Sequence, residues 1–267
     1  MNAIHSTPSQ PGSARLPPKT VNLRRANFWA TDIPDYTFIH LVGMKLGFPV
    51  QTICTAQLLH TKYTRRHFES TGYTRTEVNI TCLFVACKAE ETIKKLRDIV
   101  LAAYIIIYPT GDYLSVSDND IEYLRRQVIM CEASLLEILH FCFEFPHPHR
   151  YLVKFARCLD VDKEIAGKAW KMTTECFQTT LPLRFPPHTV ALGALYLASK
   201  LAHAPLEPPT ITTTDGDLTP DHSPWYVKLG ARPEDVDEFS HHMIDFYIAS
   251  SRKPVTPTVA THSEVPN

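Results

Sequence analysis

Glycine is scarce in this sequence, and it contains neither a long apolar run nor an excess of one charge. The 267 residues include nine glycines and 21 prolines, and the prolines lie between long periodic segments, which favours an all-helical protein. No run approaches the roughly 18 apolar residues of a membrane span, and the N-terminus has no apolar signal core. Because 27 basic and 28 acidic residues nearly cancel, whole-surface attraction to nucleic acid or lipid is not expected. We expect a soluble chain whose partner is a protein.

The cysteines do not form a disulfide or metal-binding motif. The chain has seven cysteines, an odd number with no C-x-x-C spacing, and most of them lie within apolar runs. This pattern predicts reduced core residues rather than disulfides or zinc ligands, and it indicates the cytosol or the nucleus. The seven residues are Cys54, Cys82, Cys87, Cys131, Cys142, Cys158 and Cys176.

No motif of a cofactor or of a catalytic centre is present. The sequence has no phosphate-binding loop, nucleophile elbow or protein-kinase motif, so we expect no cofactor and no catalytic residue. The histidines of PHPHR (146–150) and the pair His241–His242 leave a metal site open as an alternative. However, adjacent histidines on a helix point about 100° apart and no acidic or cysteine partner has ligand spacing. We therefore predict no metal site.

Helical segments fill the chain between two polar tails. Residues 1–20 and 252–267 are polar and rich in proline, and we predict that they are disordered. Periodicity and capping signals predict helices at 34–47, 50–67, 75–91, 94–107 and 119–141, then at 147–159, 163–181, 187–202 and 233–250, with a shorter one near 224–230. An N-terminal helix or arm is expected at 21–33.

The stretch CLFVACKAEE (82–91) occupies the third predicted helix. Thr74 and Glu77 have the T-x-x-E spacing of a capping box that opens this helix. The residues that follow are apolar or small on every side, which is typical of a helix in the centre of a helical domain. In the fifth predicted helix, the spacing of the apolar residues predicts a buried stripe of Ile121, Leu124, Val128, Leu135 and Leu139.

An internal repeat sets the predicted architecture. CLFVACK at 82–88 returns as ALYLASK at 194–200, an offset of 112 residues. The same offset carries the first, second and fifth predicted helices onto helices of the second half. We predict two five-helix domains, at 34–146 and 147–251, each built around a central apolar helix. The second contains a loop insertion at 203–224, where five prolines replace most of a helix.

Tandem five-helix repeats with an alanine-rich central helix ending in lysine resemble the cyclin family. The stretch FVACKAEETIKKLRDIV is similar to transcription-type cyclins (the C, K, L and T groups). Its ETIKKLRDI continuation looks closest to the cyclin (beta) subunit of the fungal kinase that phosphorylates the C-terminal repeat domain of RNA polymerase II. TAQLLHTKYTRRHF, EASLLEILHFCFEF and LYLASKL carry the resemblance through both halves.

The resemblance implies a kinase-binding site at the end of the third helix. Lys88 matches the family lysine, and Glu132 matches the family glutamate, which together hydrogen-bond main-chain groups beside the αC helix of a cyclin-dependent kinase. A lysine can donate to carbonyls and a glutamate can accept from amides. The open alternative is that both are ordinary surface charges paired with each other. The other predicted interface residues are Glu91, Lys94, Lys95 and Arg97.

The repeat limits this site to the first half. Lys200 retains the lysine, but the position 112 residues beyond Glu132 is Ile244. We therefore expect the second box to be mainly structural.

The resemblance also implies a function. A cyclin of this group would carry out no chemistry itself and would activate a nuclear cyclin-dependent kinase that acts on the polymerase repeat domain, promoting transcription elongation. A third regulatory subunit is implied as well, and direct nucleic-acid or membrane binding is not.

A DNA-binding protein with the same duplicated fold, like the core of general transcription factor IIB, is the alternative. Against it, residues 35–146 carry 11 basic and 13 acidic residues, and 147–258 carry 12 and 13. Neither half has the positive excess of a nucleic-acid clamp.

Overall fold

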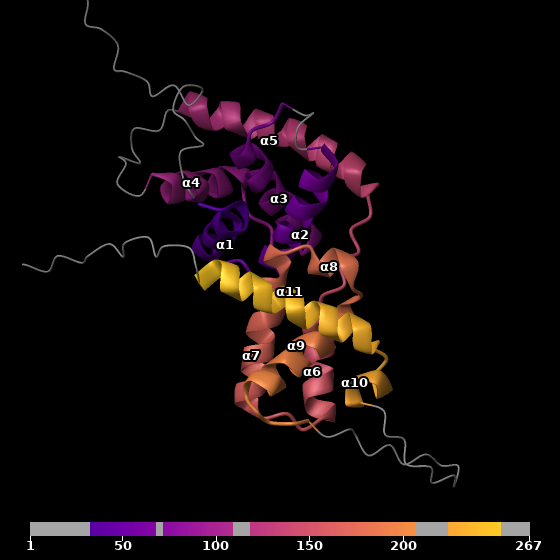
Figure 1. Ribbon diagram of the computed structural model, residues 1–267. Coiled ribbons are helices and arrows are strands. Elements are labelled where there is room, and N and C mark those ends of the chain that lie inside the picture. Colours follow the sequence, from indigo (N-terminus) through magenta and orange to yellow (C-terminus); the bar gives the residue numbers. More distant parts are fainter. Residues whose placement is uncertain (1–32, 68–71, 109–117, 207–223, 252–267) are drawn as a thin grey trace, which may run out of the picture.

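The computed structural model describes residues 33–67, 72–108, 118–206 and 224–251. Over these residues every regular element is a helix (Figure 1), so the all-α class is confirmed. The first half contains α1 (Asp35–Leu46), α2 (Val50–His67), α3 (Arg75–Ala89), α4 (Leu96–Ile107) and α5 (Asp118–Leu139). The second half contains α6 (Pro148–Cys158), α7 (Lys163–Glu175), η2 (Cys176–Gln178), α8 (Leu181–Arg184), α9 (Pro187–Leu201), α10 (Trp225–Lys228) and α11 (Pro233–Ser251).

Each half surrounds one buried helix, as predicted. In Figure 1, α3 lies among α1, α2, α4 and α5, and α9 lies among α6, α7 and α11, with which it makes contacts. Eleven residues of α3 are buried, from Thr76 to Cys87, and ten of α9 are buried, from Thr189 to Ser199. Adding 112 to the bounds of α3 returns the bounds of α9. The predicted tandem arrangement of helices around two central apolar helices is confirmed.

The capping box and the apolar stripe form as the sequence predicts. The Thr74 side chain accepts a hydrogen bond from the Glu77 amide, and the Glu77 carboxylate accepts one from the Thr74 amide at 2.7 Å. Two amides that an unassisted helix N-terminus leaves unpaired are thereby satisfied. Along α5 the predicted stripe is buried against α2, α3 and α4.

Two predicted helix bounds are wrong. The single helix predicted at 163–181 divides into α7, η2 and α8. Thr179 is extended, and its hydroxyl accepts from the Leu181 amide at 3.1 Å. Pro182 lies in the first turn of α8, where a proline is tolerated because its missing amide would have no helical partner. Helix α4 begins at Leu96 rather than at 94, so Lys94 precedes it and Lys95 is its N-cap.

Several predictions fall outside the described residues. These are the two tails (1–20 and 252–267), almost all of the N-terminal helix or arm at 21–33, and most of the loop insertion at 203–224, including the counterpart of α4. The domain boundaries at 146 and 147 lie within the described residues and stay a prediction. Among the described residues, no helix is long and apolar enough to cross a membrane.

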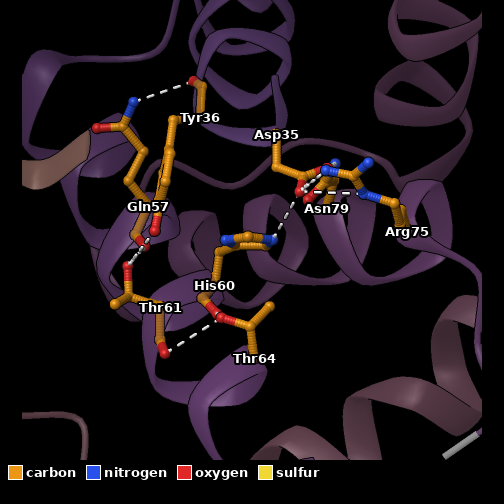
Figure 2. Close-up of polar contacts among 8 residues, drawn as sticks. All are labelled: Asp35, Tyr36, Gln57, His60, Thr61, Thr64, Arg75 and Asn79. Atoms are coloured by element: carbon orange, nitrogen blue, oxygen red, sulfur yellow. Dashed lines mark hydrogen bonds and ion pairs between the residues drawn. The ribbon is translucent and has the colours of Figure 1, made fainter. Parts of the chain in front are cut away.

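A polar network holds the N-terminus of α3 against α1 and α2 (Figure 2). The Asp35 carboxylate forms an ion pair with Arg75 and accepts a hydrogen bond from the Asn79 amide at 2.9 Å. His60 of α2 lies 3.7 Å from the same carboxylate. This network fixes one end of α3, and Lys88 lies at the other end.

The two halves share contacts through α2. The Cys54 side chain is fully buried and belongs to the hydrophobic core of the second half, although α2 belongs to the first. The link between α5 and α6 contributes His147, whose Nε2 lies 3.1 Å from the Thr55 hydroxyl. The second half therefore packs directly on α2 of the first half.

Candidate functional site

The candidate site begins where α3 ends. The Glu90 amide bonds the Ala86 carbonyl at 2.9 Å, and the Thr92 amide bonds the Cys87 carbonyl at 2.9 Å. Glu91 adopts a left-handed backbone with φ 55°, which turns the chain away from the helix axis. Lys88, one residue before the end of α3, thus projects from the last turn of a helix that is otherwise buried.

Lys88 and Glu132 are brought together by the packing of α3 on α5. The Lys88 Nζ lies 2.7 Å from the Glu132 Oε1. The lysine side chain is 48% exposed, whereas the glutamate is 15% exposed. The Lys88 ammonium also lies 3.9 Å from the centroid of the Phe84 ring, a cation–π contact that orients it.

The geometry leaves both groups able to bond a partner's main chain. An ammonium has three hydrogen-bond donors and a carboxylate has two acceptor oxygens. The ion pair uses one donor and one oxygen, so the others can bond a partner. An exposed ion pair contributes about 0–1 kcal/mol to stability. The ion pair between Lys88 and Glu132, which the sequence analysis left open as an alternative, is present. It also holds the two side chains close together at the surface.

The predicted rim residues occupy two positions. Glu91, Lys94 and Lys95 are exposed in the loop between α3 and α4. Arg97, in the first turn of α4, donates to Asp118 at 3.2 Å, so its charge is directed to the start of α5 rather than toward Lys88. The structure thus gathers three rim charges on the loop after Lys88 and places Arg97 apart from them.

Two apolar residues at this surface were missed in the sequence. Ile93, between Glu91 and Lys94, is 78% exposed, and Ile129, one turn before Glu132 on α5, is 45% exposed. Large apolar side chains at the centre of a polar rim are typical of protein interfaces. In the sequence they are only two isoleucines near predicted interface residues. Their exposure could not be predicted, because it depends on how the helices pack.

Glu90 has a different role from its neighbour Glu91. Its carboxylate accepts from the Thr55 hydroxyl at 2.7 Å and lies 3.1 Å from His147 Nε2. It therefore joins the end of α3 to α2 and to the second half. The motif presents Lys88 to solvent and directs Glu90 into the junction of the two halves.

In the second half the lysine is retained and the glutamate is replaced, as the repeat predicts. The Lys200 ammonium lies 5.4 Å from the Tyr196 ring, which repeats the Lys88–Phe84 arrangement at the offset of 112. Ile244 of α11 takes the place of Glu132 and is partly exposed. No carboxylate of the described residues pairs with Lys200.

The histidines considered as metal ligands have other contacts. His147 bonds Thr55 and Glu90, and His149 lies 3.0 Å from the Thr174 hydroxyl. His241 contacts the Asp237 carbonyl and His242 contacts Arg184. Over the described residues, no group of three His, Cys, Asp or Glu side chains could hold a metal ion.

The cysteines are free thiols and mostly lie in the core. Cys54, Cys82, Cys87, Cys131 and Cys176 are buried, while Cys142 and Cys158 are exposed. Burial raises the pKa of the Cys82 and Cys176 thiols well above the usual value, so these side chains act as small apolar residues.

The fold repeats a set of helices around two buried helices, and the site is a pair of charges at the end of the first of them. Comparison with known proteins identifies the domain of the first half. Residues 34–144 match the profile of the cyclin N-terminal domain. The first half of the chain therefore contains a cyclin N-terminal domain.

A CTD kinase subunit and a T-type cyclin are among the similar proteins. The chain is 34% identical over 191 residues to the CTD kinase subunit beta of Schizosaccharomyces pombe, covering 70% of this chain and 54% of that protein. It is 28% identical over 233 residues to Cyclin-T1-4 of Arabidopsis thaliana, covering 86% of this chain and 41% of that protein. The chain thus spans about half, or less, of the length of these relatives.

A solved structure shares the fold. A chain of the yeast RNA Pol II CTD kinase CTDK-1 complex matches with a TM-score of 0.64 and 22% identity, over 84% of this chain and 70% of that one. At this identity the match supports the cyclin fold and nothing finer.

Proposed function

We propose that this protein is the non-catalytic cyclin subunit of a nuclear kinase complex, and that it binds and activates a cyclin-dependent kinase acting on the C-terminal repeat domain of RNA polymerase II. Activation of that kinase would promote transcription elongation. The observation that carries the proposal is the Lys88–Glu132 pair, held at 2.7 Å on the exposed end of a buried helix. The similarity to CTD kinase subunit beta and to transcription-type cyclins supports the choice of substrate.

The mechanism follows from what a kinase requires. Catalysis needs a lysine–glutamate ion pair that includes the αC helix of the kinase and needs an ordered activation loop. A partner that binds the active arrangement more tightly shifts the population toward it, and moving from 1:99 to 99:1 requires about 5.5 kcal/mol of differential affinity. Lys88 and Glu132 would contribute by bonding main-chain groups of the kinase, which works for any side chains that the kinase presents there.

The surroundings of the pair complete the proposed interface. Ile93, in the loop after α3, and Ile129, one turn before Glu132 on α5, are exposed, and Glu91, Lys94 and Lys95 are exposed in the same loop as Ile93. Burial of two such side chains contributes about 1.5–3 kcal/mol each when complete. We place Arg97 at the edge of the proposed interface, because its ion pair with Asp118 directs its charge to the start of α5. A third regulatory subunit forms part of the proposed complex, and neither nucleic acid nor membrane does.

The test is kinase stimulation by a double variant. Lys88→Ala with Glu132→Ala is expected to lower kinase recovery, or activity on a polymerase-repeat peptide, by about tenfold or more, because the paired anchors of an interface carry much of its energy. Thermal unfolding should change little, since an exposed pair adds about 0–1 kcal/mol. Co-purification from the native cells, followed by a kinase assay, measures both.

Lys200→Ala is the matched control. This lysine occupies the repeat position of Lys88, stacks on the equivalent aromatic ring, and lacks the carboxylate partner. Its variant should retain full stimulation. Full stimulation by the folded double variant, or equal loss with Lys200→Ala, would remove Lys88 and Glu132 from the proposed site.

A further inference from the structure

A second polar surface lies away from the Lys88–Glu132 pair, at the C-terminal ends of α2 and α5. Lys62, Arg65 and Arg66 of α2 line a hollow of about 520 Å³, together with His140, which follows α5. Its remaining lining residues are Ile138, Leu139 and Leu183. Because Leu183 lies in α8, the hollow is completed by the second half of the molecule.

Among the residues that the structure describes, the three cations of this hollow have no carboxylate partner. No ion pair joins Lys62, Arg65 or Arg66 to an acidic residue among the described parts of the chain. Burial lowers the pKa of Lys62; the neighbouring Cys142 opposes this shift, and the Arg66 charge adds to it. Clustered cations without a counter-charge repel one another unless an anion binds between them.

The C-terminus of α5 does not account for these cations. Backbone amides of His140, Phe141 and Cys142 already bond the carbonyls of Glu137, Leu136 and Leu139. The Ile138 carbonyl accepts from Arg66 at 3.2 Å. The last carbonyls of this helix are thus occupied, and Lys62 and Arg65 are not needed to satisfy them.

Contacts hold part of the cluster in place. The Lys62 ammonium lies 5.1 Å from the centroid of the Phe145 ring, and Arg66 is held by its bond to Ile138. Arg65 is exposed and can close over a bound group. A fixed fork of arginine donors suits the oxygens of a phosphate, which can accept two parallel hydrogen bonds from one guanidinium.

We propose that this hollow binds a phosphorylated serine or threonine in a peptide segment of a partner protein. The cations would bond the phosphate, and Ile138, Leu139 and Leu183 would contact an apolar neighbour of the phosphorylated residue. A nucleic acid fits less well, because the charges line a single hollow and neither half of the chain carries a basic excess along which a backbone could run. The site is separate from the kinase-binding surface and does not depend on the proposed function.

The test is direct binding by the purified full chain, without a kinase. The probes are two fluorescent nine-residue peptide mixtures, identical except for phosphoserine or serine at the centre, and a single-stranded oligonucleotide of similar length. Anisotropy should show about tenfold tighter binding of the phosphorylated mixture, because charge-assisted bonds to a phosphate are roughly twice as strong as neutral ones. The Arg65→Glu variant should remove that preference without changing the helical circular dichroism.

Arg157→Glu is the matched control, because Arg157 is exposed in the last turn of α6 and the variant changes net charge and helix-end electrostatics in the same way. It should bind as the unmodified chain does. Equal affinity for both peptide mixtures, or equal loss in the two variants, would overturn the proposal. Tighter binding of the oligonucleotide would overturn it in favour of a nucleic-acid site.

Discussion

Two buried histidines, His60 and His149, lie in surroundings that disfavour a positive charge. Burial lowers the pKa of His60 to about 4, with Asp35 opposing the shift and Arg75 adding to it. Burial, with His147 adding to it, lowers the pKa of His149 to about 4. The Nδ1 atoms of both rings lack a hydrogen-bond partner among the described residues. Both side chains are therefore neutral in the folded protein at neutral pH.

These shifts predict loss of stability on acidification. Below a pH of about 6.5 the unfolded chain binds protons at both histidines and the folded chain does not, until about pH 4. The free energy of unfolding should be fully retained above about pH 6.5 and fall by up to about 1.4 kcal/mol per pH unit for each histidine as the pH drops toward 4. Urea unfolding across this range measures the slope.

The variant His60→Gln should reduce this slope, because it removes one titrating group. His241→Gln is the control, since His241 is exposed on α11. An unchanged slope in His60→Gln would contradict the proposed cause.

At the scale of the elements, α9 and α11 approach each other closely at Gly193. A Cβ atom at this position would lie 2.6 Å from Cδ1 and 2.9 Å from Cγ of Phe239. Both residues are fully or almost fully buried, so the ring has little room to move. The glycine therefore permits the central helix of the second half to contact α11.

Gly193→Ala should destabilise the protein by about 1–3 kcal/mol, the usual cost of overpacking a core. Gly167→Ala provides the opposite case, because Gly167 lies within α7 and a Cβ atom there meets nothing within 4 Å. That variant should be stabilised by up to about 1 kcal/mol through helix propensity and reduced freedom of the unfolded chain. Chemical denaturation of both variants measures the difference, and equal stabilities would show that Phe239 moves aside.

At the scale of the whole molecule, a small polar cluster joins the two halves. Glu90, at the end of α3, bonds Thr55 of α2 and His147 of the link to α6. Both partners are buried, and the core of the second half takes in Cys54 from the neighbouring position on α2. The halves thus share both polar and apolar contacts.

Glu90→Ala should lower the free energy of unfolding by about 1–3 kcal/mol, because it leaves buried polar groups without their partner. Glu91→Ala, one residue away and exposed, should stay within about 0.5 kcal/mol of the unmodified chain. Calorimetry of both variants makes the comparison. If Glu90→Ala and Glu91→Ala unfold alike, the cluster does not stabilise the junction.

Local sequence by itself determined the helices and their repetition. A capping box, an apolar period and proline stops act over a few residues, so they predicted α3 and the stripe of α5 directly. Comparing the two halves at one offset predicted that α9 repeats α3 and that Glu132 has no equivalent. The Lys88–Glu132 pair came from family resemblance, which aligned two positions 44 residues apart.

Only the tertiary structure decided the features that depend on how helices dock. The sequence KAEE does not distinguish the inward Glu90 from the exposed Glu91, because the difference comes from a left-handed turn and from partners on α2 and on the link before α6. The hollow lined by Lys62, Arg65 and Leu183 joins residues more than 100 positions apart. Such contacts depend on the relative placement of packed helices, and short-range periodicity contains no information about that placement.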